Sequence, residues 1–381
     1  MITISCRNSK TSKYLKYILT IDMHGKIPYV PPPEREKAMD QYFPVVKIRG
    51  GAEDRGRQQG TLLKERIHQS IAFYKKQFLQ PEEQILDIAR QFRESTKAFR
   101  TDLYREIESM SLAAGVEPLW IYALNGRTEL LNLNPMECTS LAFRKERLIG
   151  QNWDWDDEVE TLAVILDIEK EDGHRIITMT EPGMIGKIGM NHRGLGVCLN
   201  FMTIEAYQPR GVPLHVLLRA ILESDTMNEA ISLIRPHLPG KVGNILIADP
   251  NGNAEDIELA GDEFFSIPVD DLFVHTNHFL TKIDYDLKLF PNTMGRYRRA
   301  RDLLPEIDVP SIEAMKRILR DHTDEEYPIC RKRFSHPWLT DDTSMTVTSI
   351  IMDLKNLQLH ITRGNPFDNP FTVLSLGSEV L

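Results

Sequence analysis

The sequence has few cysteines, no excess of basic residues and no long apolar run. Its four cysteines, in 381 residues, are widely spaced and form no CxxC pair, which argues against a disulfide framework and a cysteine-rich zinc site. Lys and Arg number 46 against 55 Asp and Glu, and the net charge of −9 argues against general binding to nucleic acid or anionic membranes. No stretch approaches the roughly 20 apolar residues of a spanning helix. We therefore expect a cytoplasmic protein without nucleic-acid or membrane partners.

The beginning of the chain differs in character from the rest. Residues 1–42 are predicted to be an N-terminal extension, because four prolines between positions 28 and 33 break any regular element. Residues 43–381 are long enough for a single large domain with an ample core. A short strand at 43–48 is followed by glycines at 51, 56 and 60, which are predicted to form a tight turn before a helix over 61–79.

Helical spacing continues from 81 to 131 in two or three helices, and strands follow. Further strands are predicted over 139–150, 162–169, 174–180, 194–202, 244–248, 254–259, 263–267, 272–275, 346–353 and 357–362, and helices over 213–223, 228–236, 293–304 and 311–321. This order favours a layered α/β fold with antiparallel sheets over a parallel βαβ sheet.

One basic run, Arg296-Tyr297-Arg298-Arg299-Ala300-Arg301, falls in a predicted helix. We interpret it mainly as the solvated face of that helix. The alternative is a site for an anionic group, such as a carboxylate or a nucleotide-bearing acyl donor.

Cys138 stands where a proline-bearing loop ends and a strand begins. A buried structural cysteine is one interpretation of this position. As a nucleophile, a thiol needs a base or a lowered pKa. If the bond between Glu137 and Cys138 breaks, the new α-amine, whose reference pKa is about 7.7–8.0, can be that base. A distant histidine, as in papain-like enzymes, is the other option.

A carboxylate follows sixteen residues later in the run Gly150-Gln151-Asn152-Trp153-Asp154-Trp155. Between two tryptophans Asp154 would be partly desolvated, and a buried carboxylate needs a partner. The amine of Cys138 could be this partner. The alternative is a turn aspartate beside two core tryptophans.

Two asparagines at predicted strand ends complete the candidate site. Asn277, in His275-Thr276-Asn277-His278, is the candidate donor to a developing oxyanion, a contribution worth about 2.7–4 kcal/mol. Asn200 could line the pocket or add a second donor, or it could be a plain turn residue. A zinc site at His275 and His278 lacks further ligands at workable spacing.

Five motifs, in order, resemble the acyl-coenzyme A:6-aminopenicillanic-acid acyltransferase family, and the resemblance covers roughly residues 43–365. They are Cys138-Thr139-Ser140, Gly150-Gln151-Asn152-Trp153-Asp154, Ile185-Gly186-Lys187-Ile188-Gly189-Met190-Asn191, Gly211-Val212-Pro213-Leu214-His215 and His275-Thr276-Asn277-His278. The resemblance implies the N-terminal-nucleophile αββα sandwich with antiparallel sheets, self-cleavage between residues 137 and 138, and amide hydrolysis or acyl transfer through a thioester.

The resemblance also implies roles for individual residues. Cys138 would be the nucleophile, Asp154 the carboxylate that orients the amine, and Asn277 an oxyanion-hole residue. The chain more distantly resembles the bile-salt hydrolases, which use the same kinds of catalytic group. In that comparison Asn200 would match a second oxyanion contributor. The residues predicted to bind substrate are Asn200, Trp153, Thr139 and His275. No metal or bound cofactor is expected, the partner is a small-molecule amide or acyl thioester (coenzyme A being a candidate carrier), and the two cleaved fragments should remain associated.

Two positions depart from the family pattern. Glu137 precedes the predicted cleavage point where the fungal acyltransferases have glycine, and its Cβ and charge could hinder the strained conformation that promotes cleavage or could assist it. Thr343-Ser344-Met345-Thr346 stands where those enzymes have an arginine, and Arg331 and Arg333 are near but out of register. The sequence therefore does not specify a β-lactam substrate.

The leading hypothesis is a zymogen that matures into a cysteine amidohydrolase or N-acyltransferase. The second is an unprocessed thiol hydrolase with His275 or His278 as base. The third is a catalytically silent binding protein of the same fold, in which Glu137 blocks maturation.

Overall fold

The computed structural model describes residues 3–4, 17–18, 42–131, 137–204, 208–237, 240–282, 292–332, 334–335 and 343–376. The predicted extension lies almost wholly outside these residues. Within it, strands β1 (Thr3–Ile4) and β2 (Tyr17–Ile18) pair antiparallel with each other. The proline-rich segment at 28–33 lies outside the described residues, so its role as a link stays a prediction.

Two larger sheets form the centre of the molecule. The eight-stranded sheet has the order β12-β11-β10-β9-β8-β7-β6-β3, and the seven-stranded sheet has the order β13-β4-β5-β15-β16-β17 with β14 beside β15. Neighbouring strands run antiparallel except β3 and β6, which are parallel. The bounds of the first sheet are β3 Val45–Gly50, β6 Val164–Lys170, β7 Arg175–Thr180, β8 Ile188–Asn191, β9 Gly196–Asn200, β10 Lys241–Ala248, β11 Ala254–Gly261 and β12 Glu263–Pro268. Those of the second are β4 Glu137–Phe143, β5 Leu148–Asp156, β13 Leu272–His275, β14 Phe334–Ser335, β15 Thr343–Asp353, β16 Gln358–Ile361 and β17 Thr372–Ser375.

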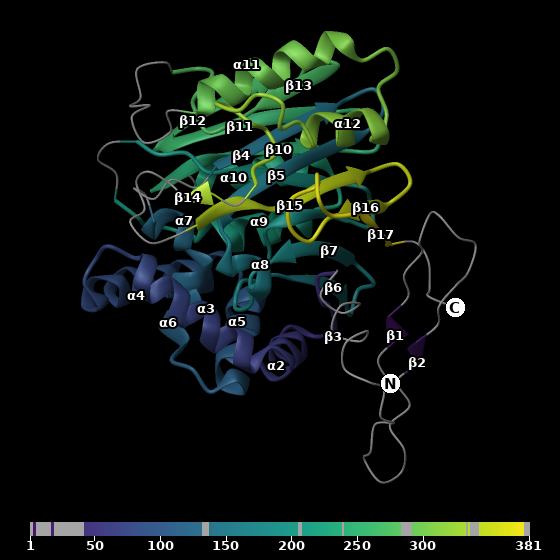
Figure 1. Ribbon diagram of the computed structural model, residues 1–381. Helices are drawn as coiled ribbons and strands as arrows, with labels where there is room; N and C mark the ends of the chain where they lie inside the picture. Colours follow the sequence, from purple (N-terminus) through teal and green to yellow (C-terminus); the bar gives the residue numbers. More distant parts are fainter. Residues whose placement is uncertain are drawn as a thin grey trace, which may run out of the picture.

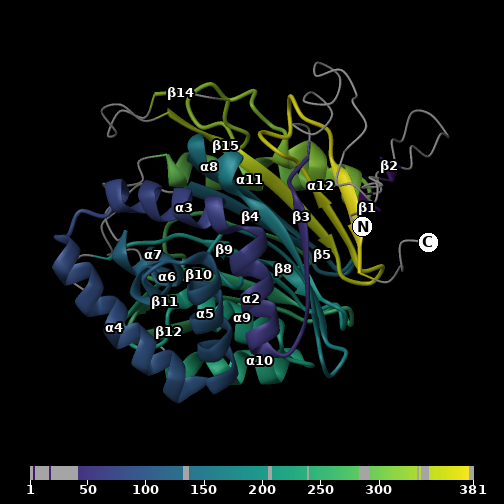
Figure 2. The ribbon, with the colours of Figure 1, turned by 90° about the horizontal axis from the view of Figure 1, so that it is seen from below.

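The sheets face each other and helices cover both outer faces (Figure 1). The sheets meet where β9 contacts β4 and β5, while α11 and α12 pack on the outer face of the seven-stranded sheet and α9 packs on β8 and β9. Figure 2 shows α2 to α6 and α10 on the side of the eight-stranded sheet, whereas α8 contacts β5 and β15 of the seven-stranded sheet. The helix bounds are α2 Ala52–Leu62, α3 Lys64–Gln77, α4 Glu82–Phe99, α5 Thr101–Ala114, α6 Pro118–Asn125, α7 Arg127–Leu130, α8 Glu158–Leu162, α9 Leu214–Leu222, α10 Met227–Ile234, α11 Thr293–Leu303 and α12 Ile312–Leu319. The expected αββα sandwich is confirmed.

Two of the glycines that were expected to form a turn have a different role. Gly56 and Gly60 lie inside α2, which begins at Ala52, directly after Gly51. A Cβ at Gly56 would collide with the carbonyl oxygen of Glu106, and one at Gly60 with that of Met110, both in α5. The predicted turn between strand and helix is confirmed at Gly51 and is wrong for Gly56 and Gly60, which permit close helix packing.

The predicted strand over 139–150 is also corrected. It is a hairpin, in which β4 and β5 are joined by a turn at residues 144–147 where Arg147 adopts a φ of 59°. Successive side chains of β4 point to opposite faces. Cys138 and Ala142 therefore join the core between the sheets, and Leu141 and Phe143 join a second core under α11 and α12.

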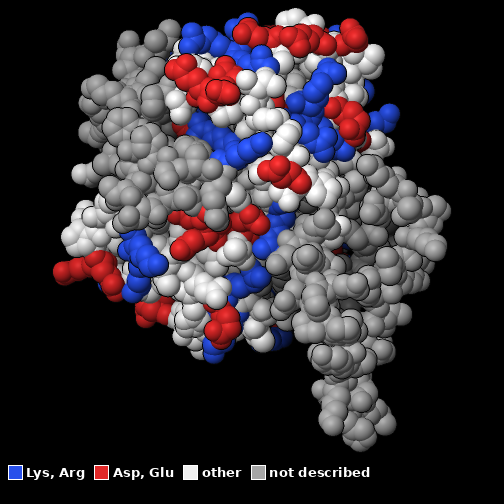
Figure 3. All heavy atoms as spheres, in the orientation of Figure 1, with Lys and Arg blue, Asp and Glu red and all other residues white. Residues whose placement is uncertain are grey.

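The surface carries charges of both signs. On the face seen in Figure 3, Lys and Arg side chains alternate with Asp and Glu side chains. Within the part of the chain that is described, no helix combines the length and the hydropathy required to cross a membrane.

Candidate active site

The register of β4 and β5 determines the geometry of the site. Cys138 lies directly opposite Trp153, and Glu137 directly opposite Asp154. Directly opposed residues in an antiparallel pair point to the same side of the sheet. The Cys138 and Trp153 side chains therefore face the core between the sheets, while the Glu137 and Asp154 carboxylates face the helical layer that contains α11.

Cys138 is buried, and both ends of the residue are held in place. Its backbone nitrogen donates a 2.7 Å hydrogen bond to Oδ1 of Asn277, and its carbonyl oxygen accepts one of 2.6 Å from Nη1 of Arg296. Burial and the Asp154 charge raise the pKa of the thiol to about 11, although a hydrogen bond from the backbone of Phe201 lowers it. This thiol is therefore protonated at neutral pH and needs a base to react.

Asp154 is 1% exposed. Its Oδ1 accepts a 2.6 Å hydrogen bond from the hydroxyl of Thr346. Its Oδ2 lies 3.7 Å from Nε of Arg331 and has no hydrogen-bond partner among the described residues. Burial raises the pKa of Asp154 to about 6, although Arg296 and the Thr346 hydrogen bond lower it. The carboxylate is therefore held in place with one oxygen left available.

Arg296 corrects our interpretation of the basic run as a solvated face. Its guanidinium is fully buried and donates to the Cys138 carbonyl, to Oγ1 of Thr139 at 2.8 Å and to Oδ1 of Asn277 at 2.7 Å. Arg298 is exposed, as the solvated interpretation expected. One arginine of the run therefore belongs to the site, where it binds three acceptors of the protein itself.

Glu137, the residue before the predicted cleavage point, is also buried. Its carboxylate forms an ion pair with Nη1 of Arg331, and its Oε1 lies 3.8 Å from Nη2 of Arg296. The charge that distinguishes this chain from the fungal pattern is thus compensated by two arginines. Breaking a buried pair of this kind typically costs about 3–5 kcal/mol.

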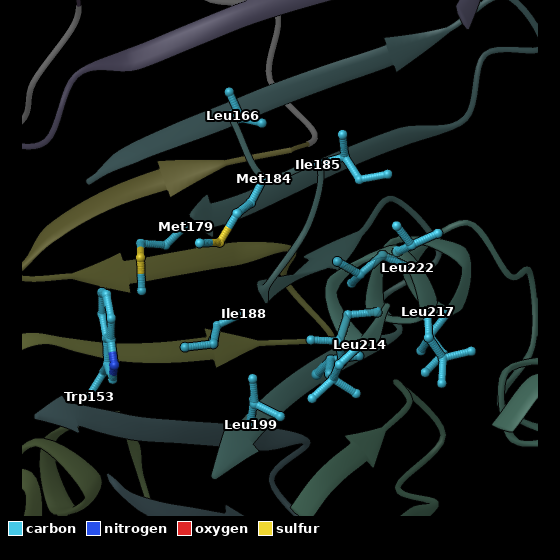
Figure 4. Close-up of a cluster of buried hydrophobic side chains, with 14 of the residues drawn as sticks. Trp153, Leu166, Met179, Met184, Ile185, Ile188, Leu199, Leu214, Leu217 and Leu222 are labelled. Atoms are coloured by element: carbon cyan, nitrogen blue, oxygen red, sulfur yellow. The ribbon is translucent and has the colours of Figure 1, made fainter. Parts of the chain in front are cut away.

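Of the four predicted substrate-binding residues, two adjoin Cys138 directly, whereas Asn200 and His275 contact Ser140, two residues further along β4. Thr139 follows it on β4 under Arg296, and Trp153 is its partner on β5. Asn200, at the end of β9, donates to Oγ of Ser140 at 2.7 Å and to Oδ1 of Asn244 at 2.9 Å. Figure 4 shows the Trp153 ring at the edge of the core between the sheets, near Met179 and Ile188. Whether these residues bind substrate stays a prediction.

His275 is engaged on both ring nitrogens. Its Nδ1 lies 2.7 Å from the carbonyl oxygen of Thr276, and its Nε2 lies 3.0 Å from Oε1 of Glu258. Burial lowers the pKa of this imidazole, but Asp256 and Glu258 raise it above its ordinary value. Burial lowers the pKa of His278 to about 4. Among the described residues, no group of three or more His, Cys, Asp or Glu side chains could hold a metal ion.

Asn277 reaches Cys138 from the end of β13. Its Nδ2 donates a 2.8 Å hydrogen bond to the carbonyl oxygen of Phe201, while its Oδ1 accepts from Cys138 and Arg296. An oxyanion-hole role would require Nδ2 to face the reacting carbonyl. The predicted nucleophile, carboxylate and amide therefore converge, and the oxyanion role of Asn277 stays a prediction.

Four residues near the site had no role assigned to them from the sequence. Arg296 was hidden in a basic run, but on α11 it shares its face with buried Thr293 and Ala300 at spacings of three and four residues, which is the signature of an inward-facing position. Lys187 is a lone charge between Ile185 and Ile188, a pattern that could have indicated a buried cation. Arg331 was noted only as an arginine near the family position and out of register with it, and Thr346 carried no clear sequence signal.

Comparisons with known proteins identify a family for this chain. A family model described as acyl-coenzyme A:6-aminopenicillanic acid acyl-transferase matches residues 143–368, more than half of the chain. This span includes Asp154, Asn200 and Asn277 and begins after Cys138. The acyl-coenzyme A:6-aminopenicillanic-acid-acyltransferase 40 kDa form of Emericella nidulans is 31% identical over 243 residues, which is 60% of this chain and 66% of that protein.

Two solved structures are similar at lower identity. A mutant of conjugated bile acid hydrolase from Clostridium perfringens has a TM-score of 0.46 and 14% identity, covering 64% of this chain and 93% of that one. Penicillin V acylase from Agrobacterium tumefaciens has a TM-score of 0.41 and 11% identity, covering 63% and 86%. On the strength of the family match, the chain belongs to the acyl-coenzyme A:6-aminopenicillanic acid acyl-transferase family.

Proposed function

We propose that this protein is a cysteine amidohydrolase or N-acyltransferase that becomes active when its own peptide bond between Glu137 and Cys138 breaks. The observation that carries the proposal is the β4–β5 register, which sets Asp154 directly opposite Glu137 and therefore beside that bond. The available oxygen of Asp154 supports it further, because a freed α-ammonium at residue 138 would give this buried carboxylate a partner of opposite charge.

The proposed reaction uses the two groups of the new N-terminal residue together. The α-amine accepts the thiol proton, and the thiolate attacks the carbonyl carbon of an amide or a thioester. The amine or thiol leaving group departs with a proton, which leaves the acyl group on Cys138 as a thioester. Water then releases the acid in hydrolysis, or an amine takes the acyl group in transfer.

We propose small-molecule amides and acyl thioesters as the substrate class. The relative from Emericella nidulans is named for an acyl-coenzyme A and an amine, 6-aminopenicillanic acid. A coenzyme A thioester is therefore the first acyl donor to test on this chain. The protein groups that act on the acyl carbon, a thiol and an amine, require no additional cofactor in this scheme.

The intact mass of purified protein tests the cleavage. We expect the wild type to yield two chains, 1–137 and 138–381, of roughly 16 and 28 kDa by proportion of chain length. Cys138→Ala should stay whole, whereas Cys198→Ala, which removes another buried cysteine, should be cut as the wild type is. N-terminal sequencing should find Cys138 at the start of the longer fragment.

Two results would overturn the proposal. One is a wild-type preparation that turns over substrate while it contains only the full-length chain. The other is a wild type whose Cys138 is never labelled by a thiol-directed acylating probe, a result that supports the silent binding protein instead.

A further inference from the structure

Lys187 is a buried lysine on the inner side of the candidate site. It is 1% exposed and lies just before β8. Its Nζ sits over the indole ring of Trp153, 2.8 Å from the ring centroid. Trp153 is the direct cross-strand partner of Cys138, so Lys187 reaches the face of the sheet on which the thiol lies. Figure 4 shows Ile188, the next residue, extending toward the same indole.

The ionisable groups around Lys187 come from α3, α7, α9 and the segment after β7. Glu181, after β7, accepts a 3.0 Å hydrogen bond from Nζ of Lys187. Glu181 also accepts from Nη2 of Arg127 in α7 at 3.2 Å and from the hydroxyl of Tyr74 in α3. His215 in α9 contacts the carbonyl oxygen of Gly186 at 3.1 Å, and its pKa lies well below the ordinary value because of burial. Lys187 and Arg127 thus share one carboxylate, with an imidazole nearby whose pKa is lowered.

This environment affects the protonation of Lys187. Burial lowers the pKa of its amine to about 7, although the Glu181 carboxylate raises it. Arg127 lowers the pKa of Lys187 further, while the nearby Cys138 thiol raises it. At neutral pH a large share of Lys187 is therefore a free amine, which can accept a proton.

The uncut chain needs such an acceptor. Before cleavage the nitrogen of Cys138 is an amide that donates to Asn277, so it cannot take the thiol proton. Asp154 lies with Glu137 on the other face of the sheet. On the basis of the proposed function, we propose that Lys187 is the base that deprotonates Cys138 in the self-cleavage step.

In this step Nζ of Lys187 takes the proton from the thiol, and the thiolate attacks the carbonyl carbon of Glu137. A carbon–sulfur bond forms and the carbon–nitrogen bond to Cys138 breaks. The departing nitrogen receives the proton held by Lys187 and becomes the α-amine. Water hydrolyses the resulting thioester, which releases the carboxyl group of Glu137 and restores the thiol. After this step the α-amine can serve as base in later turnovers.

Freshly translated, radiolabelled full-length chain allows the cleavage rate to be followed from pH 6 to 9.5. For the wild type we expect a rate that rises with a midpoint near pH 7. Lys187→Met should slow cleavage by roughly 10²-fold or more at pH 7.5, as removal of a general base does. Lys187→Arg keeps the positive charge opposite Glu181 but is no base, so it should be comparably slow. Cleavage of Lys187→Met should recover partly at pH 9.5, where hydroxide replaces the amine.

Lys241→Met is the matched control. Lys241 is also buried, its pKa is lowered to about 8 by burial, and its carboxylate neighbour is Glu129. Its removal should leave the cleavage rate unchanged. The inference is wrong if either Lys187 variant is cut at the wild-type rate, or if the wild-type rate is flat between pH 6 and 8.5. The pH dependence of the wild-type cleavage rate is measured without any variant, so it does not depend on whether the variants fold. A wild type that is never cut would refute the proposed function itself.

Discussion

The side-chain oxygen of Asn277 accepts a 2.7 Å hydrogen bond from the backbone nitrogen of Cys138, although the two residues are 139 positions apart. Arg296 donates to the same oxygen and to the Cys138 carbonyl, so it ties the strand to the asparagine. The position of Cys138 is therefore set by residues from β13 and α11 as well as by its own hairpin. The consequences can be tested separately for each contact.

Arg296→Lys should slow both maturation and turnover by roughly 10²-fold, because a single ammonium cannot replace a guanidinium that binds three acceptors, and small misplacements of reacting groups have effects of this size. The measurement is the cleavage rate together with amide or thioester hydrolysis. Arg298→Lys, on the exposed side of the same helix, should behave as the wild type. Equal rates for the two variants would contradict the assigned role of Arg296.

Asp154→Asn should stabilise the fold at neutral pH. The pKa of Asp154 is raised from 3.8 to about 6, so the folded state holds this proton more tightly than the unfolded state does. Stability that the protonated carboxyl contributes below pH 4 is therefore lost as the pH rises through 6. A shift of about 2 units corresponds to about 3 kcal/mol, which the neutral asparagine should recover at pH 7.5 but not at pH 4.

Urea unfolding of Asp154→Asn in a Cys138→Ala background measures this gain on uncut chains. The parent for comparison is Cys138→Ala alone, so both proteins unfold as single chains. A variant less stable than its parent at pH 7.5 would show that the carboxylate stabilises the fold instead.

Thr346→Val should move the acid limb of the plot of turnover rate against pH to higher pH. The Thr346 hydroxyl lowers the pKa of Asp154 by donating to it, and valine keeps the shape without the donor. Thr348→Val is the control, because its hydroxyl donates to the carbonyl oxygen of Thr362 and not to Asp154. Thr348→Val should lose about 1 kcal/mol of stability, and Thr346→Val should lose more, because the Thr346 hydroxyl also accepts a 2.8 Å hydrogen bond from the backbone nitrogen of Arg331. If the pH profiles of Thr346→Val and Thr348→Val shift equally, the Thr346 hydroxyl does not control the pKa of Asp154.

His275→Gln and His278→Gln should each keep turnover within several-fold of the wild type. His275 is held by Glu258 and Thr276, and His278 has a pKa of about 4, too low for an efficient base at neutral pH. A histidine-based thiol hydrolase requires a loss of about 10²-fold or more from one of these changes. Initial rates on one amide and one thioester substrate, with the folded fraction measured for each variant, decide between the mechanisms.

The sequence predicted the strands and the late helices well because their signals are local. α11 and β13 match their predicted ranges closely, and β13 does so because an apolar run bounded by turn residues is visible without tertiary information. Gly56 and Gly60 were misinterpreted because a glycine that opens a turn and one that admits a neighbouring helix look the same in sequence. Only the approach of α5 distinguishes them.

Part of the candidate site could be predicted because its sequence signals are also local. Cys138, Asp154 and Asn277 lie in motifs with unusual local composition, and the structure brings them together. Arg296 and Lys187 were missed because their importance depends on burial against residues far away in sequence. A charged side chain in a helix or before a strand is usually solvated, and only its packing shows otherwise.

The parallel pairing of β3 with β6 joins segments from the two sides of the Glu137–Cys138 bond. Helices α2 to α7 also precede that bond, and their apolar side chains belong to the same hydrophobic core as those of the later strands. A cut there would leave a two-chain molecule whose interface is its own interior. Refolding of the cut protein from denaturant would then be a second-order process that weakens on dilution, whereas the uncut Cys138→Ala chain would refold at a rate independent of concentration.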